Sequence, residues 1–170
     1  MSLAIASHGK FPFTLLNRTK NLDAKHHAGN YSSFHSFYLE EHRDPTCRVL
    51  HVIGTSLVIA TALLKHPKAI PHLCLGVSGG LFLCEYLSPL RNGVVEFIAL
   101  FVVTAVSGVL AKEKFPWQLL LMGYFFAWVG HAFFEHNTPA TFIYPTYSLL
   151  SDFRMWYQML TGDLSWTERI

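Results

Sequence analysis

The sequence predicts an all-α membrane protein: a helical bundle with about four transmembrane helices and amphipathic helices at its flanks. The first observation is composition, since 51% of the 170 residues are hydrophobic and only 14% are charged. Soluble domains average about 25% charged residues. The second observation is a series of four apolar runs joined by connections of only a few residues, which favours a compact antiparallel bundle.

The four apolar runs are approximately 49–64, 69–87, 93–111 and 117–134. A helix needs about 20 apolar residues to cross a bilayer, with a usual range of about 17 to 25. The first run is therefore marginal, and it either spans or forms a re-entrant or buried helix. The other three are long enough to span. Four spans would place both termini on one side of the membrane, and basic residues in the N-terminal part favour the cytosolic side.

The two ends of the chain differ from its apolar middle. We expect residues 1–30 to form a polar arm and residues 31–170 to form a single membrane-embedded domain. Residues 31–44 read as a short amphipathic helix that Pro45 ends or bends, because proline lacks an amide proton. Its apolar side carries Phe34, Phe37 and Tyr38.

A second amphipathic helix is predicted over residues 148–164. This helix either lies at the membrane interface, which its aromatic residues favour, or packs on the bundle from outside the membrane. Its predicted apolar side consists of Leu149, Leu150, Phe153, Trp156, Tyr157 and Leu160.

Several function classes find no support in the residues. The net charge of +2 gives no electrostatic reason to expect nucleic acid as a partner. The three cysteines form no Cys-x-x-Cys pair, so neither a zinc knuckle nor a disulfide framework is expected. The sequence also lacks a phosphate-binding loop and a dinucleotide glycine pattern.

Candidate chemistry lies in histidines and one carboxylate near the two ends of the bundle. His131 and Glu135 are four residues apart, so on an α-helix they share one face. His51 begins the first run, on the same side of a four-span bundle as the end of the fourth. His42 is nine positions before His51 and would point away from it on a straight helix. The bend at Pro45 allows both to approach one centre.

This residue set leaves three interpretations open. Imidazoles with a carboxylate suit iron, zinc, manganese or copper. Alternatively the group is a structural His–Glu cluster that only specifies helix packing, or histidine pairs bind a haem. His136 points away from Glu135 and ranks below it, and His35 is a candidate neighbour of His42. The remaining histidines lie in the polar arm or at the opposite end of the bundle.

Two stretches, FYLEEHRDPTCRVLHVIGT (37–55) and GHAFFEHNTPATFIYPTYSLLSDFRMW (130–156), resemble a small family of membrane proteins. The family is that of the Fe(II)-dependent 2-hydroxy-fatty-acid dioxygenases, and it was formerly described only as a domain of unknown function. The resemblance implies that His42, His51 and His131 are iron ligands or essential neighbours, with Glu135 close by. Cys47 stands where this motif leads us to expect asparagine.

The family resemblance also implies an activity. We expect α-oxidation of 2-hydroxy fatty acids by O2 to the acid one carbon shorter, within sphingoid-base breakdown, at the endoplasmic reticulum if the source is eukaryotic. The hydroxyl and carboxylate of such a substrate form a chelating pair for Fe(II), and its acyl tail would lie in the membrane. Tyr38 and Arg154, and less so Arg48, are candidate substrate contacts. For Arg154 a salt bridge to Asp152 or to lipid phosphate is the stronger alternative.

Overall fold

The computed structural model describes residues 31–87, 93–110, 112, 114–137, 139 and 144–170. Within these ranges the chain is all-helical, as predicted, and contains no strand. The predicted arm, residues 1–30, lies outside the described residues. The helices are α2 (Tyr31–Glu40), α3 (Pro45–Lys65), the short η1 (Pro67–Ala69), α4 (Ile70–Leu87), α5 (Gly93–Leu110), α6 (Trp117–Gly130), the π-helical η3 (His131–Glu135) and α7 (Pro145–Thr161).

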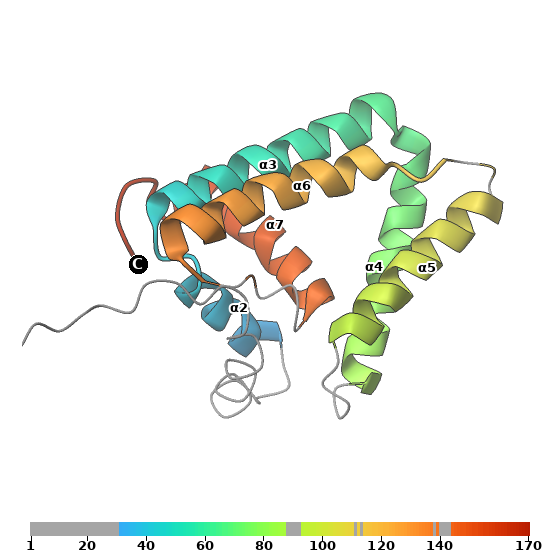
Figure 1. The fold of residues 1–170 in the computed structure, drawn as a ribbon, viewed down its shortest axis with the longest axis horizontal. Helices are drawn as coiled ribbons and strands as arrows, with labels where there is room; N and C mark the ends of the chain where they lie inside the picture. Colours follow the sequence, from blue (N-terminus) through green and yellow to red (C-terminus); the bar gives the residue numbers. More distant parts are fainter. Residues whose placement is uncertain (1–30, 88–92, 111, 113, 138, 140–143) are drawn as a thin grey trace, which may run out of the picture.

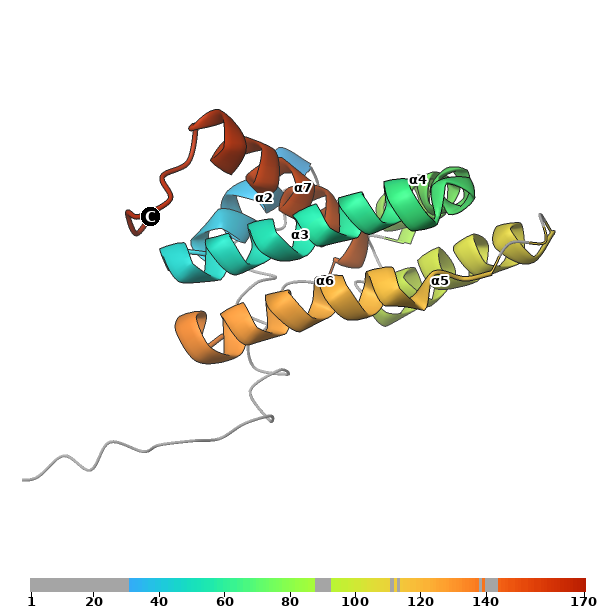
Figure 2. The same ribbon diagram turned by 90° about the horizontal axis from the view of Figure 1, so that it is seen from above.

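The helices form two antiparallel pairs with α7 between them. Helices α3 and α6 lie side by side along most of their length, and α4 packs on α5 in the same way (Figures 1 and 2). Helix α7 contacts α2, α3, α4 and α5 and so connects the two pairs. Helix α2 lies against α7 near the beginning of α3 (Figure 1).

The junction between α2 and α3 follows from two residues. Pro45 occupies the first turn of α3, where its missing amide proton costs no hydrogen bond. Asp44 caps this helix by accepting a hydrogen bond from the Thr46 backbone N–H at 2.8 Å. Helix α2 ends at Glu40, so the predicted break at Pro45 is confirmed, and His42 lies in the connecting turn.

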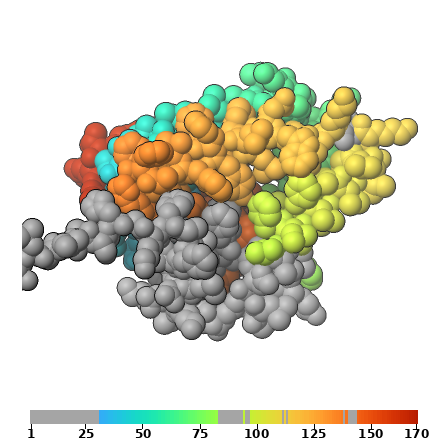
Figure 3. All heavy atoms as spheres, in the orientation of Figure 1, coloured from blue at the N-terminus to red at the C-terminus, as the bar shows by residue number. Residues whose placement is uncertain are grey.

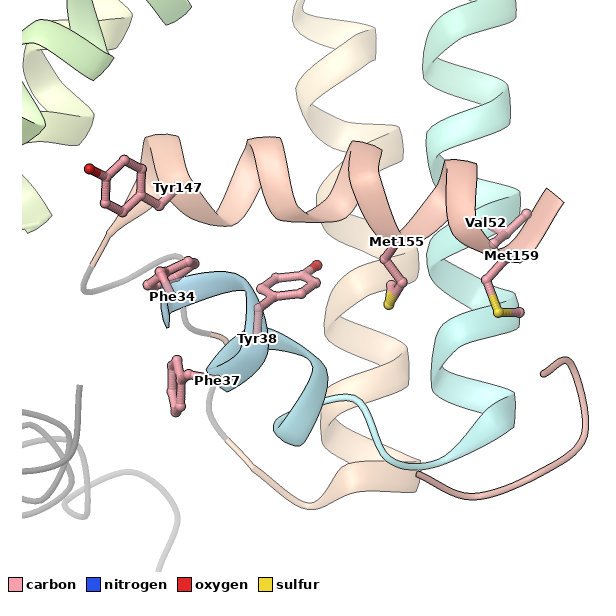
Figure 4. Close-up of a cluster of buried hydrophobic side chains, with 7 residues drawn as sticks. All are labelled: Phe34, Phe37, Tyr38, Val52, Tyr147, Met155 and Met159. Atoms are coloured by element: carbon pink, nitrogen blue, oxygen red, sulfur yellow. The ribbon is translucent and has the colours of Figure 1, made fainter. Parts of the chain in front are cut away.

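An aromatic cluster joins α2 to α7. The side chains of Phe34, Phe37 and Tyr38 are 3–5% exposed, which confirms the predicted buried side of α2. Figure 4 shows Phe34 and Tyr38 on the side of α2 toward α7, with Tyr147 at one end of the cluster and Met155 further along. Because aromatic residues bury a large apolar area, this contact fixes α7 against the turn that carries His42.

Helix α7 buries both polar and apolar residues, and part of its predicted apolar side faces outward. Its buried residues include Ser148, Ser151 and Met155, whereas Phe153 and Tyr157 of the predicted apolar side are exposed. In a soluble protein this would be unfavourable, but an apolar outer side suits contact with lipid. The placement at the membrane interface stays a prediction.

Among the described residues, two helices are long and apolar enough to cross a membrane. They are Pro45–Lys65 and Trp117–Glu135, and only 39% and 17% of their apolar windows are buried inside the protein. The core helix of a soluble protein would be mostly buried. On α6, seen across the face in Figure 3, the side chains of Leu121, Phe125 and Trp128 are all exposed.

Of the roughly four predicted membrane spans, the structure supports two as candidates. The first apolar run, judged marginal from the sequence, forms the 21-residue helix α3 and is one of the two candidates. The apolar part of α5 extends only over Phe97–Leu110 among the described residues. A four-span topology therefore stays a prediction.

Candidate metal centre

Three histidines from separate elements meet at one end of the α3–α6 pair. His42 comes from the turn after α2, His51 from the second turn of α3, and His131 from the end of α6. The centroids of the His42 ring and the other two rings are 4.6 Å apart, and those of His51 and His131 are 5.3 Å apart. We call this group the histidine cluster. All three side chains are at most 7% exposed.

Every histidine of the cluster is oriented by a hydrogen bond at Nδ1. The acceptors are Tyr38 O, Asp152 Oδ1 and Asn137 Oδ1 for His42, His51 and His131, each at 2.6 Å. Because a carbonyl or carboxylate oxygen can only accept, the ring proton of each neutral imidazole lies on Nδ1. Each Nε2 then carries a lone pair, as in metal-ligating histidines whose other nitrogen donates to the protein.

The orientation of Asn137 is fixed by its own partners. Its amide nitrogen donates to Glu41 O at 2.9 Å and to Glu41 Oε2 at 3.0 Å. The amide oxygen is therefore the atom that faces His131, which makes Nδ1 of His131 the donor. In this way the turn after α2 and the end of α6 hold each other in place.

Asp152 of α7 holds His51 from across the bundle, 101 residues away in the chain. Tyr38 donates its hydroxyl proton to Asp152 Oδ1 at 3.1 Å, and the Thr55 hydroxyl donates to Oδ2. Asp152 thus accepts hydrogen bonds from His51, Tyr38 and Thr55, and it keeps the His51 ring in one orientation.

Two ring nitrogens of the cluster, on His42 and His51, lack hydrogen-bond partners within the described part of the chain. His42 Nε2 and His51 Nε2 are buried and have no hydrogen-bond partner. Leaving a polar atom buried and unpaired costs roughly 1–3 kcal/mol. Burial, together with the neighbouring His51 and His131, also holds the pKa of His42 well below its ordinary value of 6.5. His42 is therefore neutral at pH 7, the state in which imidazole binds a metal.

Distances within the group fit one metal ion after a small contraction. The ligand atoms of the histidine cluster and of Cys47 all lie within 4.8 Å of one another. Two ligands on opposite sides of an ion, with typical bonds of about 2.1 Å to nitrogen and 2.3 Å to sulfur, are at most about 4.4 Å apart. A movement of a few tenths of an ångström closes the difference.

The segment after α6 is a π-helical turn. His131–Glu135 form the turn, and the backbone N–H of His136 donates to His131 O. His136 then adopts φ 52°, so the chain reverses and brings Asn137 back to His131. Single π-turns inside α-helices often occur at functional sites. His136 is exposed, consistent with its low rank in the sequence analysis.

Glu135 lies beside the cluster and outside the group of converging ligand atoms. Its carboxylate accepts a hydrogen bond from the Asp44 backbone N–H at 2.5 Å, next to the N-terminus of α3. It therefore connects η3 to the turn that carries His42. A role for Glu135 as a metal ligand stays a prediction.

The two predicted substrate contacts occupy different environments. Tyr38 is buried, and its ring stacks on His42 with centroids 4.0 Å apart. Arg154 is exposed, with its guanidinium carbon 6.0 Å from the centroid of the Tyr31 ring. His35, expected near His42, stacks on the far side of Tyr38 and donates from Nε2 to Gln158 Oε1 at 3.0 Å.

Arg48 connects the C-terminal residues to the turn that carries His42. Its guanidinium is fully buried and donates to His42 O and Arg43 O at 3.0 and 2.8 Å. It also donates to Ser165 O at 3.0 Å and to Glu168 O. These bonds use two of its nitrogens to hold backbone, so Arg48 has a positional role that the sequence did not indicate.

Sequence reasoning missed two residues that orient the cluster. Asn137 was not identified as a site residue, and Asp152 was considered only as a possible partner of Arg154. A usable signal was present for Asp152, because Ser148, Ser151 and Asp152 form a polar stripe at helical spacing on α7. No comparable signal existed for Asn137, whose position depends on the π-turn.

Fold and site together define an all-helical protein with a buried cluster of imidazoles that can hold a metal ion. The chain belongs to the family described as 2-hydroxy-palmitic acid dioxygenase Mpo1-like, whose model matches residues 28–164. This match extends the resemblance seen at the two ends of the sequence through the apolar middle. No curated protein and no solved structure matches the chain.

Proposed function

We propose that this protein is an Fe(II)-dependent dioxygenase that converts 2-hydroxy fatty acids to the fatty acid one carbon shorter. The observation that carries the proposal is the histidine cluster, whose ligand atoms converge while each Nδ1 is held by the protein. Membership of the Mpo1-like family supplies the substrate class. The reaction balances with one O2, because losing the carboxyl carbon as CO2 removes four electrons and yields one water.

The cluster residues would share the work as follows. His42, His51 and His131 hold the iron through Nε2. Tyr38 O, Asn137 and Asp152 fix the three rings so that binding requires little reorganisation. Bound Fe(II) would supply the electron transfer to O2 and a chelation site for the substrate's hydroxyl and carboxylate.

The outer surface suits a lipid substrate. Ile53 and Leu57 of α3 and Phe133 of η3 are exposed apolar side chains on the elements that carry the cluster. We place the acyl tail along such apolar faces, within a membrane, and in a eukaryote within the endoplasmic reticulum. Arg154, exposed on α7, is our candidate contact for the substrate carboxylate.

The test is turnover by purified protein loaded anaerobically with Fe(II) in detergent. Given 2-hydroxypalmitate and air, it should consume O2 and form pentadecanoic acid, measured by mass spectrometry. His131→Ala should abolish product, whereas His136→Ala, five residues on and exposed, should retain it. Iron-loaded protein that forms no product, or product formation that survives His131→Ala, would contradict the proposal.

The two alternative functions are separable from this one. A purely structural cluster leaves the buried Nε2 atoms of His42 and His51 unpaired, which a packing role does not explain. It predicts no stoichiometric metal. A haem between two imidazoles would have to separate rings whose centroids are only 4.6–5.3 Å apart. An absorption spectrum of the purified protein distinguishes the haem alternative directly.

A further inference from the structure

Cys47 is the fourth side chain of the group around the histidine cluster. Its Sγ lies within 4.8 Å of the histidine ligand atoms, and the residue is fully buried. Cys47 is in the first turn of α3, four residues before His51, so both side chains project from the same face of the helix. The resemblance led us to expect asparagine at this position, whereas this chain has a cysteine.

Close packing against α6 holds the thiol in this position. A Cβ added at Gly130 would lie 2.8 Å from Cys47 Sγ and 3.4 Å from Cys47 Cα. The two helices therefore meet at Cys47 and Gly130, directly before His131. A larger residue at this position would force either the thiol to move or the two helices to separate.

The unpaired nitrogens indicate that this group binds something. His42 Nε2 and His51 Nε2 are buried, have no hydrogen-bond partner, and belong to the same converging set as Cys47 Sγ. If Cys47 only filled space, the two buried imidazole nitrogens beside it would have no reason to lack hydrogen-bond partners. Nitrogen and sulfur ligands together are a common donor set for divalent transition metals.

We propose that Cys47 is a fourth ligand of the metal in the substrate-free site, bound through Sγ as a thiolate. The inference rests on the proposed function, since it adds a ligand to the same site. On binding, the S–H bond breaks, the proton goes to solvent, and a metal–sulfur bond forms without any change in oxidation state. The thiolate lowers the net charge of the site by one, which favours retention of a divalent ion in a buried environment.

Cobalt is the probe that reports sulfur directly. The protein is stripped with a chelator and titrated anaerobically with Co(II) in detergent. Thiolate bound to Co(II) gives an intense charge-transfer absorption in the near ultraviolet, which imidazole ligands do not give. The decisive variant is Cys74→Ala/Cys84→Ala, in which Cys47 is the only remaining thiol. It should bind one Co(II) and keep the full absorption band.

Removal of the thiol should abolish the charge-transfer band without abolishing Co(II) binding. Cys47→Ser should still bind Co(II) through the histidines, lose the band, and bind at least about tenfold more weakly, since even changes behind the ligands cost roughly 10- to 100-fold. X-ray absorption of the iron-loaded wild type, which requires no variant to fold, should show sulfur at about 2.3 Å.

The outcomes separate the two proposals. If the protein binds one Co(II), loses it in His131→Ala, and shows neither the band nor a sulfur neighbour, Cys47 is only a packing residue and the metal site stands. If the wild type binds no metal at all, both the proposed function and the role of Cys47 are wrong.

Discussion

The two helix pairs of this protein bury different kinds of residues. The α3–α6 pair, with α2 and α7 packed beside it, buries the histidine cluster and Arg48 in a network of hydrogen bonds. Among the described side chains of the α4–α5 pair, Thr104 is the one buried polar group, and apolar residues such as Val106 and Val109 face outward. The first pair is built to hold polar atoms in place, and the second gives apolar surface and close packing.

This difference shows where the chemistry of the chain is concentrated. Polar groups inside an apolar bundle are costly and are usually functional. At the site end each histidine of the cluster has a fixed partner for Nδ1. At the α4–α5 end, packing depends on small residues such as Gly76, which lets α5 approach closely. Substitutions in the two regions should therefore have different consequences for metal binding.

We expect the largest effect from Gly130→Ala, which adds a methyl group where α3 and α6 meet. The new Cβ would lie 2.8 Å from Cys47 Sγ, so either the helices separate or the thiol moves. Overpacking of this kind costs about 2–3 kcal/mol, and metal affinity should fall as well. Thermal unfolding in detergent and metal titration measure the two effects.

Gly123→Ala, on the same helix, is the matched control. A Cβ there would lie 3.6 Å from Val58 Cγ2, an ordinary van der Waals contact. Because alanine is favoured over glycine in a helix by up to about 1 kcal/mol, this variant should be neutral or slightly stabilised. Equal losses in both variants would contradict the close contact at Gly130.

The next largest effect is expected from Asp152→Asn. It removes the negative charge that accepts bonds from His51, Tyr38 and Thr55. Metal affinity should fall roughly 10- to 100-fold, or about 1.4–2.7 kcal/mol, as it does when the partner of a metal-binding histidine is lost. Asp163→Asn, whose carboxylate contacts only Thr161 among the bonds the structure describes for it, should bind metal like the wild type.

A smaller and purely structural effect is expected from Gly76→Ala in the α4–α5 pair. The added Cβ would overlap Thr104 Oγ1 and approach Leu100 O to 3.3 Å, so the Thr104 side chain or the two helices must shift. We expect a loss of about 1–2 kcal/mol in unfolding free energy. Gly79→Ala, with Val103 at 3.6 Å, is its control.

Metal binding is the readout that makes Gly76→Ala informative. The folded fraction of this variant should bind metal with wild-type affinity, because none of the side chains described for the α4–α5 pair belongs to the converging group. A tenfold loss of affinity in folded Gly76→Ala protein would show that the two regions are not independent.

The smallest effect concerns pH. Burial lowers the pKa of His35 below 6.5, although its bond to Gln158 opposes this. The folded state therefore prefers neutral His35, and stability is complete above pH 6.5 and decreases as the pH falls below it. At pH 5.5, one unit lower, His35 can account for at most about 1.4 kcal/mol.

The contribution of His35 to the pH dependence of stability is the difference between wild type and His35→Gln. Unfolding of metal-free wild type and His35→Gln is followed at pH 7.5 and pH 5.5, and the variant should lose less stability than the wild type on acidification. His66→Gln is the control, because His66 forms the same kind of bond with Gln118 at 2.7 Å in an exposed position. A wild-type pH dependence in His35→Gln would refute the assignment.

Much of the fold was accessible from the sequence because it depends on local rules. Pro45 predicted the break that turns His42 toward His51, and the structure confirms the break. The buried side of α2 followed from its aromatic spacing. Which side of α7 faces the bundle was left open, because an amphipathic helix can turn its apolar side either to lipid or to the protein. In the structure Phe153 and Tyr157 point outward.

The site was predictable only in outline. That His42, His51 and His131 lie near one end of the bundle follows from helix order, and the structure brings their rings together. The spacing argument for Glu135 assumed an α-helix, whereas the chain forms a π-turn there. Contacts across about 100 residues, such as His51 with Asp152, depend on how α7 crosses the bundle. Local sequence patterns do not predict that crossing.

The most direct test of the histidine cluster is the iron content of the purified protein. Wild type and the variants His42→Ala, His51→Ala and His131→Ala are loaded anaerobically with Fe(II), desalted, and analysed by elemental mass spectrometry alongside His136→Ala. We predict one iron per chain in wild type and His136→Ala, and a large loss in the other three. Wild-type protein without stoichiometric iron, or His131→Ala protein with as much iron as the wild type, would contradict the account.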